Sequence, residues 1–264
     1  FMLTLALCHT VVTEANPLDH ELRDFKAESP DEAALVSVAR DVGFALKQKV
    51  KDDIILDVYG EERRYKVHSA IAFTSARKRM SNIVETPAGK FYLLTKGADN
   101  VIFQRLDKSA TEDEVIKKTA LHLEEYANEG LRTLCIARRE LDGKYVRDWL
   151  ARYKRANELI DENRDELIDS LGDEIERDLI LLGGTAIEDR LQDGVPDSIL
   201  LLAQAGIKLW VLTGDRVETA INIGFLCNLL ENNMQLLVIN PDEDQVLDPR
   251  YVDDLLTTHL HTVY

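Results

Sequence analysis

The segment Ile207–Gly224 has the spacing in this sequence that most strongly suggests chemistry. It is IKLWVLTGDRVETAINIG: an apolar run typical of a buried strand, then Thr213-Gly214-Asp215, then a helix-like pattern. In an open α/β sheet, ligands bind at the carboxyl ends of the strands, where this hydroxyl, glycine and carboxylate could face a phosphate. Gly214 would admit close backbone approach, and the following helix would direct its N–H groups at the anion. The alternative is a strand–turn–helix with no catalytic role.

A second segment is expected at the same rim. Thr185–Gln192, TAIEDRLQ, follows another apolar run and carries Asp189 between a glutamate and an arginine. Because both segments follow strands of one predicted sheet, their polar side chains are expected to meet. Two independent contributions make this rim a stronger candidate than either segment alone.

The basic segment Phe73–Ser81, FTSARKRMS, is unusual in so acidic a chain. An aromatic ring can stack on a nucleotide base, while nearby cations such as Lys78 can meet phosphates. The alternative is an exposed basic turn with Phe73 in the core.

Three further charged residues stand where a ligand could use them. Lys96 ends the strand-like run YLLT and could lie at the bottom of a pocket, or it could be a surface lysine. Arg132 lies inside an otherwise apolar strand and needs an anion, either a phosphate or an acid such as Glu32. Glu32 itself follows Ser29-Pro30 at the capping-box position of a predicted helix.

The elements that must position these residues fall into two predicted domains. Residues 1–178 predict an α+β domain with an antiparallel sheet, which includes a hairpin from Ser69–Val84 and Lys90–Lys96 around Pro87-Ala88-Gly89. Residues 179–264 predict a βαβαβ run and hence a partial α/β domain with a parallel sheet. The expected elements of that run are strands Leu179–Gly183, Ile207–Leu212 and Gln235–Ile239, and helices Val195–Ala205 and Glu218–Leu229.

Between these domains the chain is strongly acidic, with ten acids from Glu158 to Asp178. A metal site is conceivable there. Apolar residues nevertheless recur at helical spacing, which favours helices that pack by this stripe and expose a solvated acidic face.

Composition excludes several classes of function. The 264 residues carry 32 basic and 48 acidic side chains, a net charge of −16, so binding to nucleic acid or an anionic membrane surface is not expected. Cys8, Cys135 and Cys227 stand apart among apolar residues, as reduced core cysteines do. The longest apolar stretch, Ile199–Leu212, is interrupted by polar residues and predicts no membrane span.

Six motifs together resemble the phospholipid-flipping P-type ATPases, in the family's order and spacing, over Phe1 to about Leu230. The SPDEAALV and RKRMS forms resemble lipid flippases rather than cation pumps, and specifically fungal flippases of the plasma membrane and endosomes. The motifs are SPDEAALV (29–36), FTSARKRMS (73–81), KGAD (96–99), EGLRTL (129–134), TAIEDRLQ (185–192) and TGDRVETA (213–220).

The resemblance implies a nucleotide-binding domain followed by part of a phosphorylation domain of haloacid-dehalogenase type. It implies that Phe73 stacks on adenine and that Glu32 lies near the base. Ser75, Lys78 and Lys96 would line the pocket, and Arg132 would reach the phosphates. Thr213, Gly214 and Asp215 would contact the γ-phosphate of ATP and support the Mg²⁺ site, whose ligands would mostly lie outside this chain. Asp189 would join that rim, and Asp189, Thr213 and Asp215 would be the catalytic residues.

The resemblance further implies a parent protein that uses ATP to move phospholipid to the cytosolic leaflet, with an accessory membrane subunit. The family's Asp-Lys-Thr-Gly-Thr and Gly-Asp-Gly-x-Asn-Asp motifs are absent from this sequence. We therefore expect a piece of a larger protein that lies on the cytosolic side of a membrane, binds nucleotide, and neither becomes phosphorylated nor transports. The alternatives are a non-catalytic acidic interaction module and a truncated haloacid-dehalogenase-type phosphatase.

Overall fold

The structure, a computed structural model, describes residues 1–15, 23–27, 29–110, 112–159, 164–188, 191–213, 217–238 and 249–263. They fall into two compact units. The first comprises Phe1–Ala127 and Leu131–Glu188, and the second Asn128–Gly130 and Asp189–Tyr264.

The first unit contains nine strands and six helices among its described residues. In chain order these are α1 (Met2–Leu7), β1 (Val12–Ala15), β2 (Arg23–Lys26), α2 (Pro30–Asp41), β3 (Phe44–Val50), β4 (Asp53–Val58), β5 (Glu61–Ile71), β6 (Arg79–Glu85), β7 (Phe91–Gly97), α3 (Asp99–Phe103), α4 (Asp113–Asn128), β8 (Arg132–Leu141), α5 (Gly143–Glu158), α6 (Arg164–Ile175) and β9 (Ile180–Ile187).

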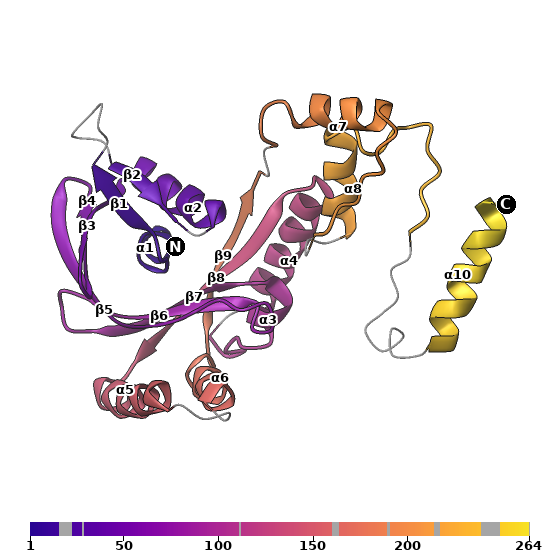
Figure 1. Cartoon of the computed structure of the whole chain (residues 1–264). Helices are drawn as coiled ribbons and strands as arrows, with labels where there is room; N and C mark the ends of the chain where they lie inside the picture. Colours follow the sequence, from indigo (N-terminus) through magenta and orange to yellow (C-terminus); the bar gives the residue numbers. More distant parts are fainter. Residues whose placement is uncertain are drawn as a thin grey trace. The chain divides into compact units, whose positions relative to one another are not determined.

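A seven-stranded sheet forms the centre of this unit, in the order β3-β4-β5-β6-β7-β8-β9 (Figure 1). Every neighbouring pair is antiparallel. The pairing of β6 with β7 runs from Arg79 opposite Gly97 to Glu85 opposite Phe91, which confirms the predicted hairpin. β1 and β2 form a separate antiparallel ribbon.

Helices cover both faces of the sheet. Alternate residues of a strand point to opposite faces, and the central strands carry apolar side chains on both, so each face needs a covering layer. Val84 and Leu94 pack in a core with α1 and α2. Their neighbours Ile83 and Leu93 pack in a second core with α3, α4, α5 and α6. The predicted α+β class with an antiparallel sheet is therefore confirmed.

The strand predicted at Leu179–Gly183 is present but belongs to this antiparallel sheet. As part of β9 it pairs with β8, with Arg132 opposite Ile187 and Arg138 opposite Ile180. Its assignment to a parallel sheet was therefore wrong. An apolar run of this length fits either kind of sheet, and the pairing partner decides between them.

The second unit contains α7 (Val195–Gln204), α8 (Val217–Leu226) and α10 (Pro249–Val263). α7 and α8 confirm two predicted helices, and each end lies within three residues of its predicted position. Ile207–Leu212 forms no strand, and Trp210 is 89% and Leu212 100% exposed. A doubly covered strand needs hydrogen-bonding neighbours on both edges, and the described part of this unit supplies none. The predicted parallel sheet is thus not observed in the described residues.

The three cysteines are free and buried, as their apolar neighbours predicted. Within the described ranges, no helix is both long and apolar enough to cross a membrane.

Candidate nucleotide site

A pocket of about 380 Å³ lies between α2 and the strands β6, β7 and β8 of the first unit. It brings together three predicted site residues that are up to 64 positions apart in sequence: Glu32, Phe73 and Lys96. Most of the wall is apolar, and the charged groups converge at one end. The remaining lining residues are Thr10, Ser29, Asp31, Leu35, Ala72, Met80, Gly97 and Leu134.

A buried ion pair forms the polar end of this pocket. Lys96 Nζ donates a hydrogen bond to Glu32 Oε1 at 2.6 Å. The other carboxylate oxygen, Oε2, accepts from the Thr10 hydroxyl at 2.6 Å and from the Thr10 backbone N–H at 3.1 Å. Burial raises the pKa of Glu32, but these donors and the lysine charge outweigh it, so the net pKa is lowered.

The local structure of α2 turns Glu32 toward the pocket rather than toward its own helix end. Ser29 occupies the N-cap position and Pro30 the first turn, as predicted, but the Ser29 side chain makes no capping hydrogen bond. The capping-box role expected for Glu32 is replaced by the contacts with Thr10 and Lys96.

Phe73 follows β5 and is 57% exposed on the pocket wall. It is therefore not a core residue, which removes the alternative interpretation of this segment. A flat apolar ring beside a pocket of this volume can stack on a heterocyclic base.

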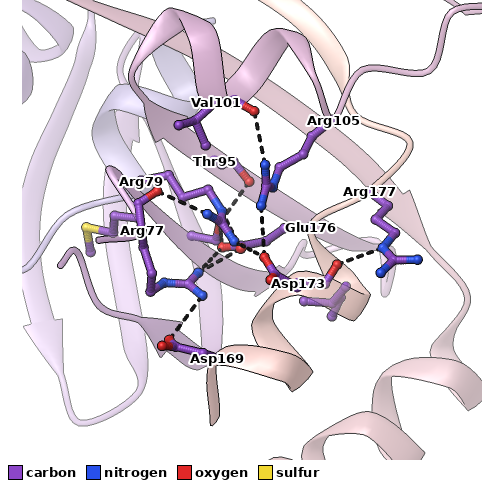
Figure 2. A network of polar contacts seen from close by, with 12 residues as sticks. Arg77, Arg79, Thr95, Val101, Arg105, Asp169, Asp173, Glu176 and Arg177 are labelled. Atoms are coloured by element: carbon purple, nitrogen blue, oxygen red, sulfur yellow. Dashed lines mark hydrogen bonds and ion pairs between the residues drawn. The ribbon is translucent and has the colours of Figure 1, made fainter. Parts of the chain in front are cut away.

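The three basic residues after Phe73 do not act together. Lys78 is exposed, as is Ser75 earlier in the same turn. Arg77 and Arg79 are buried, with about 6% and 4% of their side chains exposed, and they contact carboxylates of α6 and the residue after it (Figure 2). The expectation that all three basic residues could meet phosphates is therefore corrected: of the three, only Lys78 is exposed to a ligand.

The acidic stretch Glu158–Asp178, which was predicted to pack by an apolar stripe and expose its acids, does so only in part. Its helical packing stripe is confirmed, since Leu171 and Ile175 lie in the second core. Glu176, however, is fully buried against the two arginines. The described residues contain no group of three or more histidines, cysteines or carboxylates arranged to hold a metal ion.

Arg132 lies at the start of β8 and is partly buried, with its Nη1 3.5 Å from Asp31 Oδ2. Its acidic partner is thus the residue before Glu32, and Asp31 itself lines the pocket. The contact with Asp31 ties Arg132 to α2, which lines the pocket through Asp31, Glu32 and Leu35.

Most of the predicted catalytic rim lies outside the described residues. Thr185 lies on β9, where its hydroxyl donates to the Leu134 carbonyl at 3.4 Å. Thr213 is exposed in the second unit. Asp189, Gly214 and Asp215 lie outside the described residues, and their roles stay predictions.

Sequence reasoning missed Thr10, Leu35, Met80 and Leu134 as pocket residues. Leu35 stands one helical turn after Glu32, and Met80 is part of the RKRMS motif, so these two could have been found from spacing. Thr10 carries no such signal, because only the fold brings it to Glu32.

Comparisons with known proteins agree with these features. A family model described as P-type ATPase, cytoplasmic domain N, matches residues 1–194. The phospholipid-transporting ATPase DNF2 of Saccharomyces cerevisiae is 52% identical over 271 residues, covering 98% of this chain and 17% of that protein. The DNF1 protein of Chaetomium thermophilum is 56% identical over 256 residues, covering 97% of this chain and 16% of its own length.

A plant relative, the probable phospholipid-transporting ATPase 12 of Arabidopsis thaliana, is 48% identical over 252 residues, covering 93% of this chain and 21% of that protein. The chain thus spans about a fifth or less of the length of these relatives.

Proposed function

The chain belongs to the P-type ATPases, in which it matches cytoplasmic domain N, and we propose that it binds ATP in the pocket lined by Glu32, Phe73 and Lys96. The observation that carries this proposal is the meeting of an exposed ring and a buried ion pair in one apolar pocket. Purine bases bind in such sites by stacking on a ring and by hydrogen bonds at one edge.

Each predicted residue has a proposed role at this pocket. Phe73 stacks on adenine, and the Glu32 carboxylate accepts a hydrogen bond from the exocyclic amine, since Lys96 and Thr10 hold it ionised. Ser75 and Lys78 lie at the exposed turn near the ribose and phosphates, and Arg132 beside Asp31 reaches the phosphates.

At the level of the parent protein, we propose an ATP-driven phospholipid translocase, since these relatives are named phospholipid-transporting ATPases. Action through an aspartyl-phosphate is part of the proposal and follows from the resemblance in sequence motifs. The cytosolic part of that protein would include a nucleotide-binding domain and part of a phosphorylation domain. The predicted division into 1–178 and 179–264 is moved to follow Glu188, because β9 belongs to the sheet of the first unit. Asp189, Thr213, Gly214 and Asp215 would then face the γ-phosphate. We also propose that the parent protein transports a phospholipid and binds an accessory membrane subunit. The part represented by this chain would lie on the cytosolic face of the membrane.

Mg²⁺ would accompany ATP in that parent protein. The described residues hold no group of three or more histidines, cysteines or carboxylates arranged for a metal ion. In the proposed binding mode this chain contributes base and ribose contacts, with charge from Lys78 and Arg132.

Isothermal titration calorimetry with ATP, with and without Mg²⁺, tests the proposal on this 264-residue chain. Phe73→Ala and Lys96→Met should each weaken binding about tenfold or more, because one removes the stacking surface and the other the partner of Glu32. Lys90→Met is the matched control. Lys90 is an exposed lysine in the same β6–β7 hairpin as Lys96, and it pairs with Glu140 of β8. No binding by the wild-type chain, or equal binding by all four proteins, would contradict the proposal and favour an interaction module.

A further inference from the structure

Glu176, the residue after α6, is a fully buried carboxylate that receives four hydrogen bonds (Figure 2). Arg77 Nη2 lies 2.7 Å from each of its oxygens, and Arg79 Nε donates to Oε2 at 2.6 Å. The Ser81 hydroxyl donates to Oε1 at 2.6 Å. All of these donors belong to the FTSARKRMS motif, almost one hundred residues earlier in the chain.

Neighbouring carboxylates complete this arrangement, which we call the Glu176 network. Asp173 accepts from Arg79 Nη2 and from Arg105 Nη2, the latter at 2.9 Å. Asp169 lies 3.6 Å from Arg77 Nη1. Three arginines therefore meet three carboxylates, and Glu176 is the member with no exposed surface. A buried pair of this kind is strongly disrupted when one partner is removed, because the other charge is left without compensation.

The Glu176 network holds the two residues on either side of Lys78. Lys78 has a positive φ of 50°, which reverses the side-chain direction between the buried Arg77 and Arg79. Its N–H donates to the Thr74 carbonyl at 2.8 Å, so the turn after Phe73 is closed. The buried arginines thus anchor a turn whose other side chains are exposed.

The same turn is locked to the end of β7. The Lys78 carbonyl accepts from the Ala98 N–H at 2.9 Å. A Cβ on Gly97 would lie 2.6 Å from Arg79 Cβ and 2.7 Å from the Lys78 carbonyl oxygen. The backbones that carry Phe73 and Lys96 therefore meet directly at this point, and only glycine fits between them.

We propose that Glu176 is a positioning residue for the nucleotide pocket: it holds the turn at 74–79 from the opposite face of the sheet, so that Phe73 and Lys78 lie where a nucleotide can use them. This inference rests on the proposed function. Glu176 does not contact the pocket and acts through Arg77 and Arg79. It also assigns a role to the acidic segment around α6, which no nucleotide motif explains.

Glu176→Gln tests the proposal, with Glu174→Gln as its matched control. Glu174 lies in the last turn of α6, two residues before Glu176, and its carboxylate accepts hydrogen bonds from Arg152 and Tyr145 of α5. ATP affinity is measured by calorimetry at low temperature, where near-ultraviolet circular dichroism verifies that each variant is folded. We expect Glu176→Gln to weaken ATP binding about tenfold, a change of about 1.4 kcal/mol, and Glu174→Gln to change it less than twofold.

Limited trypsin digestion supplies a readout that does not depend on nucleotide. Cleavage after Arg77, Lys78 or Arg79 requires local opening of the turn, so its rate should rise several-fold in Glu176→Gln and not in Glu174→Gln. A lower melting temperature with unchanged ATP affinity and unchanged cleavage would overturn the proposal, because it would show a purely structural role.

Arg77→Lys is the second variant, for use if Glu176→Gln does not fold. It keeps the buried charge, but its single nitrogen cannot reproduce the guanidinium, whose Nη2 contacts both Glu176 oxygens while Nη1 faces Asp169. It should therefore weaken ATP binding with little loss of stability. Unchanged binding would count against the proposal. If the wild-type chain binds no ATP, the proposed function fails, and equal cleavage of the turn in all variants would overturn the positioning role independently.

Discussion

Lys96 Nζ lies 2.6 Å from Glu32 Oε1, and only 9% and 13% of the two side chains are exposed. The lysine charge is therefore matched within the protein before any ligand arrives. An arriving phosphate would have to compete with this carboxylate, which supports our proposal that the base, rather than the phosphates, binds beside this pair. Because Glu32 titrates in acid, the dependence of the unfolding free energy on pH also reports whether this ion pair is intact.

Lys96→Met should remove a loss of stability that Glu32 gives the wild type on acidification. The folded-state pKa of Glu32 is lowered, so ionised Glu32 stabilises the fold above the unfolded-state pKa, about 4.3, and that contribution is lost as pH falls through the folded-state pKa. Without Lys96, burial dominates and raises the folded-state pKa, so the variant should be less stable at pH 7, and protonation of Glu32 should no longer lower its stability as pH falls. Urea unfolding from pH 7 to about pH 3 measures the difference between the two profiles.

The control for this experiment is Lys90→Met, which breaks an exposed pair with Glu140. Exposed pairs contribute little to stability, so its pH profile should follow the wild type. Superimposable profiles for Lys96→Met and the wild type would mean that Glu32 is not held ionised by Lys96.

His9 should make the fold lose stability on mild acidification. Its Nδ1 accepts from the Val11 N–H at 3.1 Å, and its Nε2 lies 2.9 Å from the Ala6 carbonyl, so both nitrogens are used by the neutral ring. Burial lowers the pKa of His9 to about 4. Because the unfolded chain binds the proton near pH 6.5, stability falls by about 1.4 kcal/mol per pH unit between roughly 6.5 and 4.

His9→Gln should remove about 2 kcal/mol of the stability difference between pH 7 and pH 5 measured by urea unfolding. His122→Gln, at an exposed position of α4, should keep that difference. A His9→Gln protein with the wild-type pH dependence would show that the ring is protonated in the fold at no cost.

Local patterns predicted the elements of the first unit well, because each depends on neighbours in sequence. The hairpin at β6 and β7 and the strand β8 follow from periodicity and turn residues. The pocket residues Glu32, Phe73 and Lys96 were found from motif spacing. Thr10 was not, since its contact with Glu32 spans 22 residues of irregular chain.

The errors arose where distant partners decide the outcome. Arg77 and Arg79 resemble Lys78 in sequence, yet their carboxylate partner, Glu176, lies 99 and 97 positions away among ten acids. β9 was placed in a parallel sheet because its apolar run is compatible with both topologies, and its pairing with β8 is a tertiary event. Periodicity contains no information on such pairings.

Gly97→Ala should weaken ATP binding strongly as well as destabilise the fold. Its Cβ would collide with Arg79 Cβ and with the Lys78 carbonyl, so β6 and β7 must separate where the pocket residues meet. Calorimetry should show at least a tenfold loss of ATP affinity. Gly89→Ala is the control, because its φ of 74° imposes about 1–2 kcal/mol of strain but its Cβ would meet nothing within 4 Å.

Comparison of the two glycine variants separates the effect of backbone strain at Gly89 from the effect of moving β6 and β7 apart at Gly97. Gly89→Ala should bind ATP as the wild type does, although it is less stable. Wild-type affinity in Gly97→Ala would show that the two strands can move apart without disturbing the pocket.

The two tryptophans should differ sharply in their access to an aqueous quencher. Trp149 is fully buried, stacks on Tyr153 and donates from Nε1 to the Leu171 carbonyl at 3.0 Å. Trp210 is 89% exposed, because the apolar run that contains it forms no strand. Iodide should therefore quench Trp149→Phe, which retains Trp210, far more than Trp210→Phe, which retains Trp149. If Trp210 were protected as well as Trp149, the run Ile207–Leu212 would be covered in solution, as a strand of the predicted parallel sheet would be.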